Sequence, residues 1–429
     1  MWSGSRGGRM AGSSSSSTYP TPTRAAEISS SDPRSGARES PGEEARRMPA
    51  TAKRILILHV RAGVGHERAA RAVEAALRSL DPSCEPIVRD ALEFSSPFLR
   101  TFYASSYNRL VDRAPRAWGF FYRQAERIPA TGFRQRVRSS LLAAGCRDFA
   151  AAAARFRADA VLCTQFLPAE VFAFLRRRGA IPVPVYCAIT DFAVHPIWVY
   201  PGIDRYFVAS EFSAEQLRST GVVAADRIEV TGVPIDPEFA SQVGMEAARQ
   251  ELGLDLDPRR LTLLLMGGGF GWGPMESMLQ VVLELDPSVQ AIVLAGRNEE
   301  LRQRLAKRAR GQEHRIKVHG FSDRVHRMLE AADLLVGKAG GLTSSEAMAR
   351  GVPIIAVRPI PGQEERNVDY LQESGAAVRA YDLDDLQYRL MHFLSDRADL
   401  ERMKANARSI GRPRSAFQVA ESILTRLTP

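Results

Sequence analysis

The feature that most constrains the fold of this chain is a series of short apolar runs, each about the length of one β-strand. The first run is Arg54–Val60. Others follow at residues 159–163, 183–189, 205–209 and 228–231. A run without regular polar alternation is typical of a strand that is buried on both faces, as in a parallel sheet. Helical stretches such as 68–79 and 213–220 alternate with these runs, so the pattern predicts a doubly wound α/β unit.

A second series of the same kind follows the proline-rich segment Gly232–Pro237, which is typical of a link between domains. Its apolar runs lie at residues 261–266, 289–294, 316–318, 332–336, 353–357 and 376–378. Both halves open with a strand that runs into a glycine-rich loop. We therefore expect two facing Rossmann-like domains, at residues 51–236 and 237–410, with a cleft between them. Ligands of such sheets bind at the carboxyl ends of the strands.

The balance of charge favours an anionic partner. The 429 residues carry a formal net charge of +9, and the sequence pI is near 9.6. Nucleic acid, an anionic membrane surface and a phosphorylated substrate all fit this charge. The cysteines form no CxxC pair and no zinc-binding spacing, so we expect buried thiols in a reducing compartment. They are Cys84, Cys146, Cys163 and Cys187.

The first residues differ in composition from the rest of the chain. Residues 1–48 are rich in Ser, Gly, Pro and Arg and almost free of apolar side chains, which predicts a disordered tail over residues 1–50. The tail has no apolar stretch of the kind that a secretory signal needs. A transit peptide and a wrongly assigned start codon both remain open. Because no run of about 18 apolar residues is free of charge, we expect any contact with lipid to be from the surface.

The segment at residues 98–142 is basic and aromatic. It holds nine arginines against two acids, Asp112 and Glu126, and its aromatic residues recur at helical spacing. This composition is typical of an amphipathic surface that rests on an anionic membrane. The alternative is a helical insertion whose aromatic side chains are core and whose arginines are solvated. No nucleic-acid-binding module is visible, so nucleic acid is a weaker interpretation.

The first motif that carries chemistry is Ala62-Gly-Val-Gly-His66, directly after the first apolar run. It lacks the third glycine of a dinucleotide fingerprint, and no acidic residue ends a second strand, so NAD is disfavoured. His66 is expected at a helix N-terminus, where the helix dipole lowers the pKa of an imidazole. A neutral imidazole there can act as a general base. The alternative is a turn histidine that caps the helix.

The second motif is Thr190-Asp191-Phe-Ala-Val-His195-Pro-Ile-Trp198. A carboxylate, an imidazole and an indole in one loop after a strand suit the binding of a hydroxylated acceptor. A metal site is disfavoured because a third ligand is missing. The alternative is a structural hydrogen bond between Asp191 and His195 within a turn.

Two glycine-rich loops of the second half suit an anionic ligand. Met266–Gly273 contains enough glycine to let something large approach the backbone. A lysine and the pair Gly340-Gly341 then separate a strand from a helix expected to begin near Thr343, and backbone amides at such a turn bind anions. Glu346 would accept hydrogen bonds from a ribose diol. Residues 343–346 also fit a capping box, and the two roles are compatible.

The hydroxyl-binding side chains Gln363, Glu364 and Asn367 follow another glycine, Gly362. They suit the hydroxyls of a sugar, although solvated loop residues are the alternative. A diphosphate site, a ribose site and a sugar site together predict a nucleotide-sugar ligand.

The motifs taken together resemble one family. They are Gly-x-Gly-His at 63–66, Thr-Asp-(x)3-His-Pro-x-Trp at 190–198, Gly-Gly-Gly-x-Gly-x-Gly at 267–273, Ala-Gly-Arg-Asn at 295–298, His-Gly-Phe-Ser-Asp-Arg at 319–324, and Lys-Ala-Gly-Gly-Leu-Thr-x-x-Glu-Ala at 338–347 with Gly-Gln-Glu-x-x-Asn at 362–367. Their order is similar to that of the monogalactosyldiacylglycerol synthases and the processive diacylglycerol glucosyltransferases, from about Arg54 to about Leu400. These are GT-B glycosyltransferases, related to the enzyme that makes lipid II.

The resemblance implies roles for individual residues. The donor site would comprise backbone around Phe321 for uracil, Glu346 for ribose, the amides of Gly340, Gly341, Leu342 and Thr343 for diphosphate, Gln363, Glu364 and Asn367 for the sugar, and Gly269, Arg297 and Lys338. The catalytic residues would be His66 and Asp191, and the acceptor would meet Gly65, His195 and Trp198. The basic aromatic segment would dock on lipid, and residues 411–429 would return to the first domain. Arg61 and Gly337 depart from the family pattern.

The expected reaction is an inverting transfer of glucose or galactose from a UDP-sugar to diacylglycerol, by a protein that is peripheral on the inner face of the cell membrane. We expect no cofactor and no metal, since helix-start amides and Lys338 would stabilise the leaving UDP. A lipid-II-type N-acetylglucosaminyl transferase, a UDP-sugar epimerase and a non-catalytic UDP-sugar sensor are the alternatives.

Overall fold

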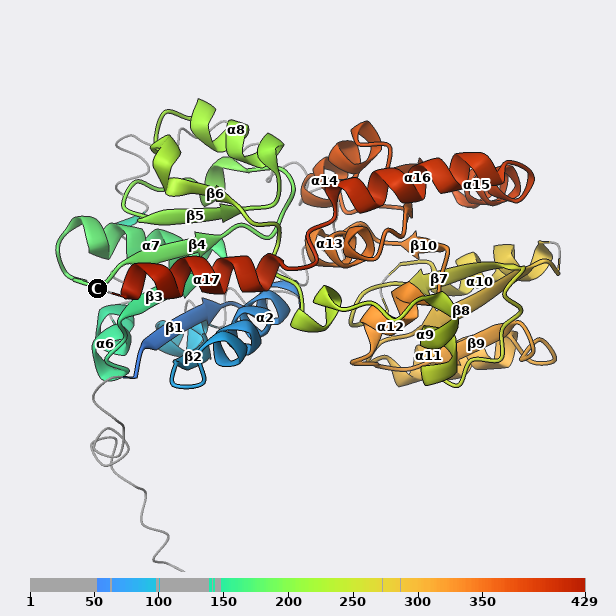
Figure 1. The fold of residues 1–429 in the computed structure, drawn as a ribbon, viewed down its shortest axis with the longest axis horizontal. Helices are drawn as coiled ribbons and strands as arrows, with labels where there is room; N and C mark the ends of the chain where they lie inside the picture. The colour runs from blue at the N-terminus through green and yellow to red at the C-terminus, as the bar shows by residue number, and fades with distance from the viewer. Residues whose placement is uncertain are drawn as a thin grey trace, which may run out of the picture. The chain divides into compact units, whose positions relative to one another are not determined.

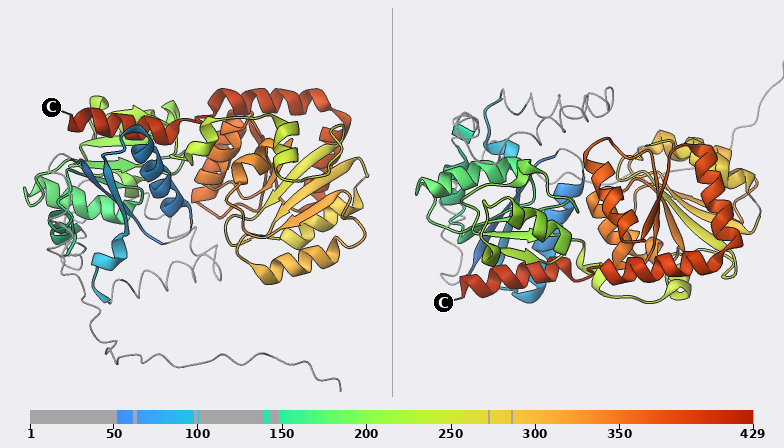
Figure 2. Two further views of the ribbon diagram at one scale, coloured as in Figure 1. Left: turned by 60° about the horizontal axis from the view of Figure 1, so that its bottom comes forward. Right: turned by 90° about the horizontal axis from the view of Figure 1, so that it is seen from above.

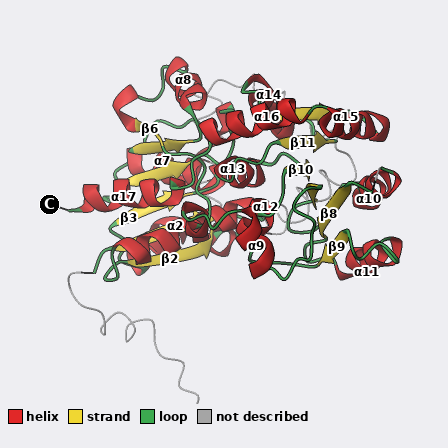
Figure 3. Cartoon of the chain, turned by 45° about the vertical axis from the view of Figure 1, so that its right-hand side comes forward, coloured by secondary structure: helices red, strands yellow, loops and turns green. Residues whose placement is uncertain are grey.

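The computed structural model describes residues 52–61, 64–97, 100, 139–140, 142, 148–271, 273–285 and 287–428. Within these residues the chain forms two six-stranded parallel sheets with helices on both faces (Figures 1 and 3). The predicted fold of two Rossmann-like sheets is therefore confirmed. We call the first sheet with its helices the N-terminal half and the second the C-terminal half. The boundary near residue 236 stays a prediction.

The N-terminal sheet has the strand order β2-β1-β3-β4-β5-β6. Its strands are β1 (Arg54–His59), β2 (Glu85–Asp90), β3 (Ala160–Cys163), β4 (Val185–Ala188), β5 (Arg205–Val208) and β6 (Ile228–Val230). The helices that cover it are α2 (Gly65–Leu80), α6 (Asp148–Arg155), α7 (Phe166–Arg177), α8 (Glu211–Ser219) and α17 (Ser415–Leu427), with short 3-10 turns η1 (Ala91–Phe94), η2 (Pro196–Trp198) and η3 (Ala225–Arg227). The turn η4 (Pro237–Ala240) follows the sheet, and its Phe239 packs with residues of the C-terminal half.

The continuous apolar strands are explained by helices on both faces of the sheet. Ile55 and Ile57 of β1 join the cluster formed with α2 and α17. Leu56 and Leu58 of the same strand point to the other face, where they pack with α6, α7 and α8. Because successive side chains of a strand alternate between faces, a strand covered on both faces buries all of its side chains and is therefore apolar throughout.

The C-terminal sheet has the order β12-β11-β10-β7-β8-β9. Its strands are β7 (Leu261–Met266), β8 (Val289–Leu294), β9 (Ile316–His319), β10 (Leu334–Gly337), β11 (Ile354–Val357) and β12 (Ala377–Ala380). Its helices are α9 (Met245–Glu251), α10 (Met275–Glu284), α11 (Glu299–Arg308), α12 (Val325–Glu330), α13 (Gly341–Ala349), α14 (Gln363–Glu373), α15 (Leu383–Ser395) and α16 (Arg397–Ile410).

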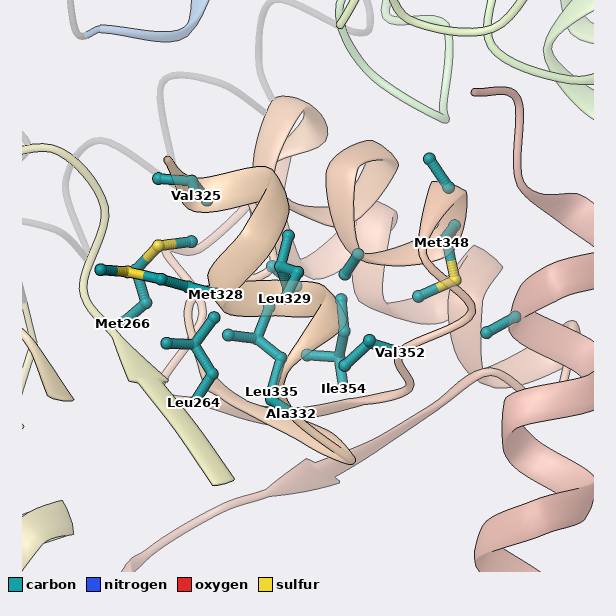
Figure 4. Packing of buried hydrophobic residues seen from close by; sticks show 14 of the residues in the cluster. Leu264, Met266, Val325, Met328, Leu329, Ala332, Leu335, Met348, Val352 and Ile354 are labelled. Atoms are coloured by element: carbon teal, nitrogen blue, oxygen red, sulfur yellow. The ribbon is translucent and has the colours of Figure 1, made fainter. Parts of the chain in front are cut away.

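One core cluster of the C-terminal half continues into the N-terminal half. Figure 4 shows its centre, where Leu264 and Leu335 of the sheet meet Met328 and Leu329 of α12. Ala69 of α2 and several residues after β4 and β6 belong to the same cluster, so the two halves share buried apolar surface.

The chain passes between the halves twice, and the two passages lie against each other. The backbone N–H of Ile235 donates to the hydroxyl of Ser415 at 3.2 Å. Gly232 has φ of +89°, and a Cβ there would lie 2.6 Å from the Cβ of Arg412. After the second passage α17 packs along α2 on the N-terminal sheet (Figures 1 and 2).

Most predicted strands are observed within two residues of their expected bounds, but β2 is absent from the prediction. Its sequence, EPIVRD, has a proline at the second position and mixes polar with apolar residues. This pattern fits an edge strand, and β2 lies at the edge of its sheet.

The prediction of buried thiols is confirmed for the described residues, since Cys84, Cys163 and Cys187 are buried and free, and the reducing compartment stays a prediction. Cys146 lies outside the described residues, as do the predicted tail and most of the basic aromatic segment at residues 98–142.

Candidate functional site

The site begins where three neighbouring strands of the N-terminal sheet end. The loop after β1 leads to His66, the second residue of α2. Thr164 follows β3 directly, and Thr190 comes two residues after β4. Because β1 pairs with β3 and β3 with β4, all in parallel, these residues meet at the carboxyl ends of the strands.

The imidazole of His66 contacts two oxygens through one nitrogen. Its Nδ1 lies 2.9 Å from the carbonyl oxygen of Thr164 and 3.0 Å from the hydroxyl of Thr190. The ring of Trp198 lies beside it, with 6.1 Å between ring centroids. Burial lowers the pKa of His66 to about 4, against the opposing hydrogen bond to Thr164. The imidazole is therefore neutral near pH 7.

The carboxylate of Asp191 is buried and bound by two side chains of α14. The amide of Gln363 donates to both of its oxygens, at 2.9 and 2.8 Å, and the amide of Asn367 lies 3.3 Å from Oδ1. The oxygen of the Asn367 amide accepts from the backbone N–H of Phe192 at 2.9 Å. Burial raises the pKa of Asp191 to about 6, although these amides and Trp198 lower it.

The residues expected to meet the acceptor are mostly buried. His195 is 2% exposed, and its Nδ1 accepts from the backbone N–H of Ile197 at 3.0 Å, which caps η2. Trp198 is also 2% exposed. Gly65 is half-buried at the start of α2, where a Cβ would lie 3.9 Å from Leu342.

The glycine pair after β10 differs from the prediction. Helix α13 begins at Gly341, with Gly340 as its N-cap and no side-chain cap, so neither a start near Thr343 nor the capping box is correct. A Cβ on Gly341 would lie 1.9 Å from the carbonyl oxygen of Thr190 and 3.3 Å from Oδ1 of Asp191. The missing side chain therefore allows the loop after β4 to meet the first turn of α13.

Glu346 lies deeper in α13 than the sequence suggested, because the helix begins two residues earlier. Its side chain is fully buried, and Oε1 lies 2.7 Å from the guanidinium of Arg68 on α2. Burial raises the pKa of Glu346, and Arg68 opposes that rise. Among the described residues neither carboxylate oxygen accepts a well-formed hydrogen bond. Both residues line a cavity of about 340 Å³, together with Arg71, Leu342 and Asp236.

The predicted sugar-binding residues lie on a helix, since α14 begins at Gln363. Glu364 pairs with Lys338, with 2.9 Å between Nζ and Oε1, and its other oxygen accepts from the backbone N–H of Ile360 at 2.8 Å. Glu364 and Asn367 are buried, which contradicts the alternative of solvated loop residues for these two positions.

Arg297, which was predicted to bind the donor, lies beside Phe321, whose backbone was predicted to hold uracil. The guanidinium of Arg297 stands 4.7 Å from the ring centre of Phe321, whose side chain is 56% exposed. The backbone N–H of Arg297 donates to the carbonyl of Gly269 at 2.9 Å. Arg297 also lines a cavity of about 650 Å³ with Phe270 and Gly271.

Two of the glycines in the loop at residues 267–273 allow close packing between loops. A Cβ on Gly271 would lie 2.5 Å from the carbonyl oxygen of Ala295. A Cβ on Gly269 would lie 3.0 Å from the side chain of Val64, in the loop before α2. The two glycine-rich loops therefore meet each other across the two halves.

Sequence reasoning missed several residues of this site. Thr164 carries no motif and reaches His66 through its backbone. The sequence pattern places Arg68 on the exposed face of an amphipathic helix, so it gave no sign of a role in the site. Tyr370 of α14 stacks on Phe192, with ring centroids 5.0 Å apart. The spacing of residues 363, 367 and 370, which places them on one helix face, is the signal that indicates Tyr370.

Acidic residues of the described chain form no group of three that could hold a metal ion. The C-terminal half contains Asp-x-Asp pairs at 255–257 and 382–384. The first pair precedes β7, at the end of the sheet opposite the site. In the second, Asp382 caps α15 by accepting from the backbone N–H of Asp385 at 2.8 Å.

Comparisons with known proteins agree with this arrangement. Residues 66–235 match the model of the monogalactosyldiacylglycerol (MGDG) synthase family, and residues 276–410 match that of glycosyl transferases group 1. The processive diacylglycerol beta-glucosyltransferase of Bacillus pumilus is 28% identical over 374 residues, which cover 87% of this chain and 95% of that protein. Its counterpart from Bacillus subtilis is 27% identical over the same shares of both chains. The chain is therefore a glycosyltransferase, and over most of its length it is similar to the diacylglycerol glucosyltransferases.

Solved structures show the same fold at lower sequence similarity. MurG of Acinetobacter baumannii has a TM-score of 0.57 and 16% identity to this glycosyltransferase. The match covers 87% of this chain and 99% of MurG. The UDP-GlcNAc 2-epimerase of Neisseria meningitidis has a TM-score of 0.53 and 13% identity, and covers 87% of this glycosyltransferase and all of its own chain. The glycosyltransferase thus has the GT-B fold. Over its described residues, none of its helices is both long and apolar enough to span a bilayer.

Proposed function

We propose that this glycosyltransferase moves a hexose from a UDP-sugar to the free hydroxyl of diacylglycerol, with inversion at the anomeric carbon. One observation carries the proposal. A neutral imidazole, His66, lies in the N-terminal half at the loop that meets the uncapped start of α13, where backbone amides would hold a diphosphate. The acceptor and the donor would therefore meet between these two turns.

In the proposed reaction the acceptor oxygen attacks the anomeric carbon while its proton moves to His66. The bond between the anomeric carbon and the diphosphate oxygen breaks, and UDP leaves with the electron pair. Amides at the start of α13 and the ammonium of Lys338 stabilise the charge on UDP. No divalent metal is required by this scheme, so we expect activity to persist in EDTA. Loss of activity in EDTA, with recovery on adding Mn²⁺, contradicts the metal-free scheme.

Donor binding would exchange contacts that the structure already contains. Gln363 and Asn367 bind the carboxylate of Asp191. We infer that hydroxyls of the hexose take the place of this carboxylate when the donor binds. The ribose diol would use the acceptor positions of Glu346, which lines a cavity and pairs with Arg68.

The membrane part of the proposal rests on composition and on the relatives. The relatives are named for action on diacylglycerol, a membrane lipid. The basic aromatic segment at residues 98–142 suits an anionic surface. We therefore expect the full chain to float with anionic liposomes and to be released by high salt, and equal flotation with neutral liposomes contradicts this role.

The deciding experiment supplies diacylglycerol in liposomes with UDP-glucose, UDP-galactose or UDP-N-acetylglucosamine. We expect a β-linked monohexosyl lipid from one of the two hexose donors, identified by mass and by the anomeric coupling constant. Transfer of N-acetylglucosamine alone, epimerised UDP-sugar, or UDP binding without turnover would each replace this proposal with one of the alternatives.

A further inference from the structure

The contacts of His66 settle which of its two ring nitrogens carries the proton. A carbonyl oxygen has no proton to donate, so its contact with Nδ1 at 2.9 Å is a hydrogen bond only when Nδ1 itself carries the proton. The Thr190 hydroxyl, 3.0 Å from the same nitrogen, can accept from that N–H as well. The Thr164 carbonyl therefore selects the tautomer in which Nδ1 is protonated and Nε2 has the lone pair, and the Thr190 hydroxyl adds a second acceptor for the same N–H.

Thr164 holds the histidine at two points. Its carbonyl binds the ring, while its hydroxyl donates to the backbone carbonyl of His66 at 2.9 Å. The backbone N–H of Thr164 is bonded in turn to Leu58 of β1 at 2.9 Å. Thr164 is fully buried and Thr190 is 6% exposed, so water competes little for these contacts. The ring of Trp198 lies beside the imidazole, tilted by 56° and with 6.1 Å between ring centroids.

We infer that Thr164 and Thr190 are positioning residues that lock His66 in the Nδ1–H tautomer, so that Nε2 is the base that receives the proton of the acceptor hydroxyl. This inference rests on the proposed function for its catalytic part. It assigns the threonine of the Thr-Asp motif a role in the N-terminal half, separate from the contacts that Asp191 makes with α14.

The same oxygens explain how a strongly desolvated imidazole can work as a base. Burial disfavours the imidazolium, as the lowered pKa of His66 shows. When Nε2 takes a proton, the positive charge is shared with Nδ1–H, and the two oxygens beside it stabilise that charge. An orienting group that accepts from one nitrogen in this way is a general device for histidine bases.

The tautomer can be measured without any turnover. The chain contains seven histidines, so their ring nitrogens can be resolved by ¹⁵N-labelled histidine and long-range ¹H–¹⁵N correlation spectra of the full chain. The variant His66→Gln assigns the His66 signals by their loss. We expect His66 at pH 7 to be neutral with the proton on Nδ1. A proton on Nε2, or an even mixture, overturns the inference whether or not the enzyme uses diacylglycerol.

The role of the Thr190 hydroxyl is tested by two substitutions of similar size. Thr190→Val removes one of the two oxygens, so we expect the preference for Nδ1–H, now held by the Thr164 carbonyl alone, to weaken and kcat to fall about tenfold to a hundredfold, with the KM for the UDP-sugar little changed. Thr190→Ser keeps the oxygen and should restore most of kcat and the wild-type spectrum. Thr220→Val, at the end of α8, is the matched control and should behave as the wild type.

The outcomes separate this inference from the proposed function. Unchanged kcat and an unchanged spectrum in Thr190→Val remove Thr190 from the positioning role. If the wild type shows the Nδ1–H tautomer but transfers no hexose to diacylglycerol, the proposed acceptor is wrong and the positioning of His66 stands. If Thr190→Val loses the folded spectrum altogether, Thr190→Ser still decides, because its failure to restore the tautomer contradicts the inference.

Discussion

Two glycine-rich turns, one in each half, make an instructive comparison. The turn after β1 leads to α2 and the turn after β10 leads to α13, and neither helix has a side-chain cap. The first turn places an imidazole at the second position of its helix, where oxygens from two neighbouring strands bind it. The second turn presents two glycines, and its backbone is approached by the opposite half.

The difference suggests a division of roles between two halves of the same fold, in which one half would hold the base and the other the donor. An uncapped helix start has free N–H groups and a partial positive charge. At α13 no side chain caps these groups, and in the proposed function they bind the diphosphate of the donor. At α2 the chain uses the same geometry to hold a titrating side chain in a fixed direction. The predictions below test this division, in order of decreasing effect.

The largest effect should come from His66→Ala. Removing a general base typically lowers the rate by about a hundredfold to ten-thousandfold, and we expect kcat to fall by that amount while the affinity for UDP persists. Steady-state kinetics and calorimetric UDP titration measure the two quantities. His314→Ala removes an exposed histidine and serves as the control. Near-normal turnover in His66→Ala would show that α2 does not supply the base.

The next largest effect should come from Gly341→Ala. Its Cβ would overlap the Thr190 carbonyl at 1.9 Å, so the two loops must separate at a cost of about 1–3 kcal/mol. We expect a lower melting temperature and weaker UDP binding. Gly340→Ala is the matched control for stability, because its Cβ would meet nothing closer than 3.8 Å. Equal melting temperatures for the two variants would show that this contact is not made in solution.

The pH profile of kcat/KM distinguishes the two candidate bases. A base must be unprotonated to act, so activity is lost as the pH falls through its pKa. With His66 as the base, the acid limb should lie near pH 4, whereas Asp191 as the base would place it near pH 6. We expect the lower limb, and we expect Asp191→Asn to leave it in place. A limb near 6 that disappears in Asp191→Asn would transfer the role to Asp191.

The smallest effect should come from the aromatic stack between the halves. Tyr370 lies between Phe192 and Phe212, with ring centroids 5.0 and 5.8 Å away. Tyr370→Leu should lower the free energy of unfolding by about 1 kcal/mol, measured by chemical denaturation. Tyr388→Leu changes a tyrosine that is 65% exposed and should have no measurable effect. Similar losses in both variants would argue against packing of α14 on the N-terminal half.

Much of the fold was readable from local pattern. Apolar runs marked strands that are covered on both faces, and helical stretches separated most of them. The pattern failed at β2, whose mixed polarity reflects its place at the sheet edge, and at α13. There the low helix propensity of glycine placed the expected start two residues late, because tertiary contact with the loop after β4 outweighs that propensity.

The candidate site was readable only in part. The motifs named His66, Asp191, Gln363 and Asn367 as separate groups for acceptor and sugar. The structure joins the last three in one hydrogen-bonded set. Nothing local to residue 191 could indicate this, because its partners lie 172 and 176 positions later in the chain.

The sequence by itself determined the alternation of buried strands with helices. It also determined the positions of the glycine-rich turns that follow the strands. These properties depend on periodicity and on residue type, which act over a few neighbouring positions. Only the tertiary structure decided the proton position on His66 and the partners of Asp191 and Glu346. Each depends on strand order and on the approach of the two halves. A displacement of about one ångström makes or breaks a hydrogen bond, so neighbouring residues in the sequence cannot determine these contacts.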